Sequence, residues 1–133
     1  MEKDYNKYGS AAKQAAEIGE NPVDSWEQAV STYFTSESSK QKGCPRNAFL
    51  GLCEVGLIKG IKDGVYLKSK RENLNKKYAI TAVEILNEIP SFTQKELWDK
   101  VREKLALGEK KHNSQMDVVL ALWQNNLIKK NTF

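Results

Sequence analysis

Two short segments carry the side chains best suited to bind an anion or the edge of a base. One contains Cys44, Arg46 and Asn47, and the other runs from Lys110 to Gln115. Arginine, asparagine and glutamine can pair with base edges through two hydrogen bonds, and lysine can neutralise a phosphate. Both segments lie where a helix is expected to begin, and the positive end of a helix dipole favours an anion. These segments therefore indicate nucleic-acid binding as a candidate function.

The candidate nucleic-acid contacts are basic or amide side chains near expected helix starts, in an expected hairpin, or between the two halves of the chain. They are Arg46, Asn47, Lys62, Lys68, Lys70, Arg71, Lys110, Lys111, Asn113 and Gln115. A second interpretation is open, because polar residues often cap helices or contact a protein partner, and runs of charge are often solvated faces. The sequence alone does not separate the two.

Charge is unevenly distributed along the 133 residues. Residues 1–66 carry eight Lys or Arg against nine Asp or Glu, whereas residues 67–133 carry thirteen against eight. An anionic partner would therefore meet mainly the second half and the basic stretch at its beginning. That stretch could follow a phosphate backbone, or it could be a solvated linker.

A catalytic interpretation depends on Cys44 and His112. Cys44 lies at an expected helix start among basic residues, a setting that favours thiol reactivity, and His112 lies in the matching loop of the second half. Nothing in the sequence brings the two together, and no orienting carboxylate accompanies them. Cys44 and Cys53 also lack the spacing of a zinc site or a disulfide framework. We therefore expect a protein that is not an enzyme and that needs no cofactor or metal.

An internal repeat positions these residues. Leu50–Lys59 aligns with Leu120–Lys129 at an offset of 70, with identical residues at five of ten positions, and Trp26 aligns with Trp98 at an offset of 72. A change of offset between elements is what a difference in loop length produces. We expect residues 7–59 and 77–129 to superpose as three-helix units.

Apolar residues recur at helical spacing within each unit. Tyr78 and Ala82 belong to one face of an expected helix, and Trp26, Trp98 and Trp123 each fall in an apolar stripe. Aromatic residues in such a stripe are typical of a core. We therefore expect the three tryptophans to be buried rather than to form a stacking surface for single strands.

Helix boundaries are indicated by capping residues. Asn21 can cap a helix that has Pro22 at its first position, and Thr93–Glu96 has the pattern of a capping box. Gly56 and Asn126 can adopt the left-handed conformation that ends a helix. Each is followed by an apolar pair, which predicts a strand after the third helix of each unit.

The strand after Gly56 is expected to form a hairpin. Leu57–Ile61 and Val65–Lys68 flank Lys62 and the pair Asp63-Gly64, which favours a tight turn between strands. The second unit has only the first of these strands, Leu127–Lys130, which could pair with Ile89–Phe92.

Three helices, a left-handed helix end and a hairpin resemble the winged helix-turn-helix superfamily in a tandem, partly degenerate form. The resemblance implies that the third helix enters the major groove and that the hairpin, or wing, holds phosphates. The stretch 43–53, together with Lys76–Ala79, is also similar to a family of small bacterial proteins with no assigned function. That family supplies no catalytic residues.

The expected fold is mainly α, with two repeated winged-helix-like units and one small hairpin wing. The first unit spans residues 1–66, and a linker with the second unit spans 67–133, packed as one compact protein. No apolar run approaches the roughly 20 residues that span a bilayer, and the polar first ten residues lack a secretory signal. We expect a cytoplasmic protein without a membrane partner.

Two functions remain at this stage. The leading hypothesis is a small regulatory protein that binds duplex DNA, as a monomer or a homodimer. The rival is a module that docks onto a protein partner, because a fold alone does not fix a function. A single face shared by Arg46, the hairpin lysines and Lys110–Lys111 would favour DNA, whereas third helices that face each other could not both read a groove.

Overall fold

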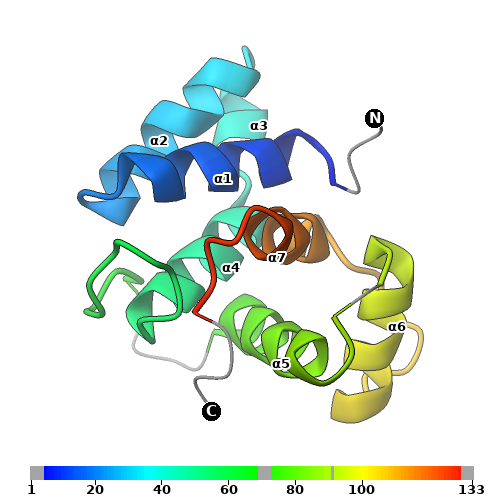
Figure 1. Ribbon diagram of the computed structural model, residues 1–133. Coiled ribbons are helices and arrows are strands. Elements are labelled where there is room, and N and C mark those ends of the chain that lie inside the picture. The colour runs from blue at the N-terminus through cyan, green and yellow to red at the C-terminus, as the bar shows by residue number, and fades with distance from the viewer. Residues whose placement is uncertain (1–4, 69–72, 91, 130–133) are drawn as a thin grey trace.

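The computed structural model describes residues 5–68, 73–90 and 92–129 (Figure 1). The regular secondary-structure elements within these ranges are all α-helices. They are α1 (Lys7–Ile18), α2 (Pro22–Tyr33), α3 (Glu37–Lys40), α4 (Gly43–Glu54), α5 (Leu74–Glu88), α6 (Gln94–Leu105) and α7 (Gln115–Gln124). Among the described residues there is no β-strand, so the fold is all-α.

The predicted hairpin wing is wrong, because residues 57–67 form an irregular loop. The Glu54 carboxylate at the end of α4 accepts the backbone N–H groups of Tyr66 at 2.8 Å and Leu67 at 2.7 Å. It also receives the ammonium group of Lys76 at 2.8 Å. An isolated two-stranded hairpin is only marginally stable. The N–H groups that a hairpin would have used are thus tied to α4 instead.

Among the described residues, the segment after α7 pairs with its own equivalent in the repeat and not with Ile89, Pro90 or Phe92. Ile58 and Ile128 form an isolated antiparallel bridge. The Lys59 N–H donates to the Leu127 carbonyl and the Lys129 N–H to the Leu57 carbonyl, both at 2.8 Å. Ile58 and Ile128 are fully buried. The two apolar pairs predicted to start strands therefore meet each other in the core.

The helix that begins each half, α1 or α5, lies against the helix that ends the other half, α7 or α4. α1 packs on α2 and α7, and α5 packs on α4 (Figure 1). Both crossings are close: a Cβ on Gly9 of α1 would lie 2.7 Å from the carbonyl oxygen of Asp117, and one on Gly51 of α4 would lie 2.5 Å from Lys76. α7 is buried from Gln115 to Trp123 and forms the centre of the molecule.

Several local predictions are confirmed. Asn21 caps α2 with Pro22 at its first position, and the capping box at Thr93 is complete. Gly56 and Asn126 both have positive φ, at 75° and 60°. The three tryptophans are buried. None of the described helices is long and apolar enough to cross a membrane.

Candidate anion-binding pocket

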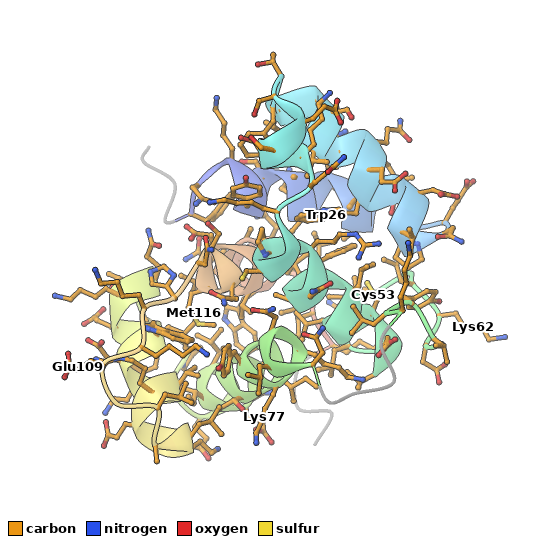
Figure 2. All side chains as sticks on the ribbon, turned by 180° about the vertical axis from the view of Figure 1, so that it is seen from behind. Trp26, Cys53, Lys62, Lys77, Glu109 and Met116 are labelled. Carbon is orange, nitrogen blue, oxygen red and sulfur yellow. The ribbon has the colours of Figure 1, made fainter. Side chains whose placement is uncertain are left out.

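The predicted binding residues do not gather on one face. Figure 2 shows Lys62 at one end of the molecule and Glu109, the neighbour of Lys110 and Lys111, at the opposite end. All four of these side chains are exposed. Lys70 and Arg71 lie outside the described residues. The described part of the chain therefore offers no continuous basic surface from the loop after α4 to the connection before α7.

At the start of α7, Gln115 is used inside the protein. The side chain is 3% exposed. Its amide nitrogen donates to the side-chain amide oxygen of Asn75 at 2.8 Å, and its amide oxygen accepts the backbone N–H of Asn113. A base edge could reach Gln115 only by displacing these partners. Asn113 is exposed, and its role in binding stays a prediction.

Three of the predicted binding residues, Arg46, Asn47 and Lys68, line one pocket between α2, α3 and α4. This α2–α4 pocket has a volume of about 540 Å³, within the roughly 300–1,000 Å³ typical of small-molecule sites. Its basic lining residues are Lys40, Arg46 and Lys68, and its acidic ones are Glu27 and Glu37. The remaining lining residues are Trp26, Val30, Ser31, Gln41, Gly43 and Asn47.

The first turn of α4 forms one wall of this pocket. Lys42, at the N-cap position, makes no side-chain hydrogen bond to the helix. The first backbone N–H groups of an α-helix have no partner within the helix, and together with the helix dipole they favour an anion. Arg46 and Asn47 are half-buried on this turn. Pro45 lacks an N–H, so the backbone donors of this turn are those of Gly43, Cys44 and Arg46, and the wall combines them with a guanidinium and an amide.

The charges around the pocket are only partly compensated. Lys40 pairs with Glu37 at 3.5 Å, and the Glu37 side chain is largely exposed. Neither Arg46 nor Lys68 forms an ion pair with any residue that the structure describes. Two cations therefore remain available for an anionic group in the pocket.

Trp26 belongs to the inner wall. It lies where α2 meets α4 (Figure 2), is 1% exposed, and stacks on Phe49 with ring centroids 5.3 Å apart. Its indole N–H has no hydrogen-bond partner within the described part of the chain. Leaving a buried donor unpaired costs about 1–3 kcal/mol, and most buried polar groups are paired. A lining residue with an orphaned donor is therefore informative.

The second unit places a tryptophan at the same helix position but pairs it. Trp26 and Trp98 are each the fifth residue of a twelve-residue helix. The Trp98 N–H donates to the Lys110 carbonyl at 2.9 Å, and the His112 ring lies 5.8 Å from the indole. Both acceptor and imidazole come from the connection 106–114 that precedes α7. The chain itself covers this second tryptophan.

Outside the pocket, the pKa values of two carboxyl groups, Glu54 and Asp117, are shifted in opposite directions. Burial of the Glu54 carboxyl opposes its ionisation, but hydrogen bonds from Lys76 and from the N–H groups of Leu67 and Tyr66 outweigh burial and lower its pKa. Burial raises the pKa of Asp117, although the Asn6 N–H donates to its carboxylate at 2.9 Å.

Cys44 and His112 are not brought together. Cys44 lies half-buried at the start of α4, and His112 lies against Trp98 before α7. No hydrogen bond between the two is seen in the described ranges. Cys53 is fully buried, and burial raises the pKa of its thiol and disfavours the thiolate.

Sequence reasoning missed Trp26, Lys40, Glu27 and Glu37 as pocket residues. Trp26 was predicted only as core, since its position in an apolar stripe carries no information about its N–H group. The repeat offers the one usable indication: the two halves share a tryptophan but differ in the connection that follows.

The described helices define a small all-α protein with an open pocket between α2, α3 and α4. Residues 5–129 match a family described as "Family of unknown function (DUF6979)", and the chain belongs to that family. No curated protein and no solved structure matches the sequence. The expected resemblance to a family without an assigned function is confirmed, whereas the winged-helix resemblance is not shown.

Proposed function

We propose that the protein binds a phosphate-bearing ligand in the α2–α4 pocket. The observation that carries this proposal is the meeting of Arg46 and Lys68 at the start of α4, where no side chain caps the helix. Arginine pairs with phosphate through two parallel hydrogen bonds, and backbone N–H groups of a helix start add further donors. These are the components of a phosphate site.

The phosphate could belong to a small molecule or to the backbone of a nucleic acid. Both sources offer the same anionic oxygens to Arg46 and Lys68. A small molecule fits the concave shape and the volume of the pocket better. Duplex binding through both third helices has less support, because Gln115 is buried at the start of α7.

Calorimetric titration at low salt tests the proposal. The probes are inorganic phosphate, ribose 5-phosphate and a short duplex of mixed sequence. Arg46→Gln and Lys68→Gln should each weaken binding of the small probes by roughly tenfold or more, since hydrogen bonds to charged groups contribute about 1.5–3 kcal/mol. Lys104→Gln is the matched control, because Lys104 is an exposed lysine on α6, away from the pocket.

The duplex arm separates the two sources of phosphate. If the duplex binds and Arg46→Gln weakens it as much as the small probes, the pocket holds a backbone phosphate. If Lys110→Gln and Lys111→Gln weaken duplex binding while Arg46→Gln changes nothing, the pocket is not the binding site and the proposal is wrong. Failure of every probe to bind would also contradict it.

A further inference from the structure

The second unit shows what an indole N–H at this helix position bonds to. Trp98 donates to a backbone carbonyl of the connection 106–114, and that connection occupies the space in front of the indole. The corresponding connection of the first unit, residues 34–42, has the same length of nine residues. Its path differs, because residues 37–40 form the helical turn α3.

In the first unit, carbonyl groups of the connection 34–42 accept hydrogen bonds from donors other than the indole. The Ser39 carbonyl accepts the Tyr8 hydroxyl at 2.8 Å, and Lys40 and Gln41 donate their N–H groups to carbonyls of the same turn. None of the carbonyls of this connection accepts the N–H of Trp26. The first unit therefore leaves the N–H of Trp26, a residue of the α2–α4 pocket, without the acceptor that the second unit supplies to Trp98.

The rest of the lining indicates what kind of molecule could supply that oxygen. Arg46 and Lys68 suit a phosphate, whereas Glu27 and Glu37 are acceptors that would repel a bare anion. Carboxylates do accept hydrogen bonds from hydroxyl groups. A pocket of about 540 Å³ also exceeds what inorganic phosphate alone can fill. The occupant must offer an anion, hydroxyl donors and a further acceptor oxygen.

We infer that the ligand is a phosphate ester of a polyhydroxylated molecule, of the sugar-phosphate class, and that one of its non-phosphate oxygens accepts the N–H of Trp26. This inference rests on the proposed phosphate binding and adds the chemistry of the remainder of the ligand. Arg46 and Lys68 hold the phosphate, Glu27 or Glu37 accepts hydroxyl groups, and Trp26 distinguishes the ester from free phosphate.

Access to the indole requires a small rearrangement of the lining. The N–H is covered in the structure, and the lining of the same pocket includes the exposed side chains of Glu27 and Gln41. Rotation of such side chains needs no movement of the backbone. The ligand oxygen would then take the place that the Lys110 carbonyl has in front of Trp98.

The test compares ribose 5-phosphate with inorganic phosphate on ¹⁵N-labelled full-length protein. The indole N–H resonance of Trp26, assigned through Trp26→Phe, should move downfield with ribose 5-phosphate and not with inorganic phosphate. Trp26→Phe keeps an aromatic ring against Phe49 but removes the donor. It should weaken ribose 5-phosphate roughly three- to tenfold, the factor for one neutral hydrogen bond, and leave inorganic phosphate within about twofold.

Trp98→Phe is the matched control, because it removes the paired indole of the other unit and should leave the affinity for both probes unchanged. If the Trp26 resonance stays in place and Trp26→Phe binds both probes as the wild type does, this inference is overturned while phosphate binding stands. If neither probe binds the wild type, the proposed function itself fails. Because the resonance is measured on wild-type protein, the result does not depend on the stability of a variant.

Discussion

The two connections that precede the third helices use the same number of residues to opposite effect. Residues 106–114 lie over Trp98 and satisfy its N–H, whereas residues 34–42 turn into α3 and leave the N–H of Trp26 unpaired beside a cavity. The difference teaches that a repeat can conserve a helix and its aromatic residue while the connection decides whether a site is open or closed.

Replacing either tryptophan with alanine should give the largest effect. Both indoles are buried, so Trp26→Ala and Trp98→Ala should each lower the free energy of unfolding by about 3–5 kcal/mol. Urea denaturation followed by circular dichroism measures this loss. A loss below about 1 kcal/mol for Trp98→Ala would show that its burial contributes little.

Substitution with phenylalanine should lower the free energy of unfolding by different amounts at the two tryptophans. Trp98→Phe removes the donor for the Lys110 carbonyl and should cost about 1–3 kcal/mol in addition to lost packing. Trp26→Phe removes a buried donor that has no partner, so the lost packing is partly offset by relief of the desolvation cost of that N–H. Paired unfolding curves should show Trp98→Phe as the less stable variant, and equal stabilities would contradict the contrast between the two connections.

The comparison extends to the C-terminal ends of α4 and α7, where Glu54 of α4 corresponds to Gln124 of α7. Glu54→Gln makes the first unit resemble the second and weakens the attachment of the loop 57–67. We expect a loss of about 1–2 kcal/mol at neutral pH. Since the pKa of Glu54 is lowered in the folded state, its contribution is present above its unfolded pKa and disappears as the pH falls through the folded value.

Stability of Glu54→Gln and wild type should therefore converge in acid. Thermal or urea unfolding between neutral and acidic pH measures the convergence. A difference that stays constant across that interval would mean that the charge of Glu54 does not hold the loop.

Asp117 gives the smallest expected effect, and its equivalent in α4 is Asn47. Burial raises the pKa of Asp117, so the ionised carboxylate is disfavoured in the folded state above that pKa. Asp117→Asn keeps an oxygen for the Asn6 N–H and should stabilise the protein by less than about 1 kcal/mol at neutral pH. The gain should vanish in acid, where the wild-type carboxyl is protonated, and destabilisation at neutral pH would contradict this expectation.

How much the sequence predicts depends on the range of the interactions. Helix ends at Gly56 and Asn126 and the capping box at Thr93 are local, and the sequence predicts them correctly. The Asp63-Gly64 pair favours a hairpin locally, but the Glu54 carboxylate, which also accepts the ammonium group of Lys76, takes the backbone N–H groups of Tyr66 and Leu67. No local pattern reveals that competition.

The pocket shows the same division. Arg46, Asn47 and Lys68 were predicted as binding residues from their types and from the expected helix start and basic stretch, and all three line the α2–α4 pocket. Trp26 was not, because its importance comes from a missing partner, which only a three-dimensional structure can show. Gln115 has a favourable residue type at a helix start, yet the packing of α7 at the centre buries it.

The bridge between Ile58 and Ile128 joins equivalent residues of the two halves, and α1 covers α7 while α5 covers α4. This is the arrangement of a domain-swapped homodimer in which two copies of one unit exchange their first helices and are then fused into a single chain. In such a chain the helices common to both halves occur twice, and the two copies of a position can lie in different surroundings, as Trp26 and Trp98 do. One copy of the tryptophan is covered and paired by the chain, whereas the other keeps an unpaired N–H next to residues that line the α2–α4 pocket.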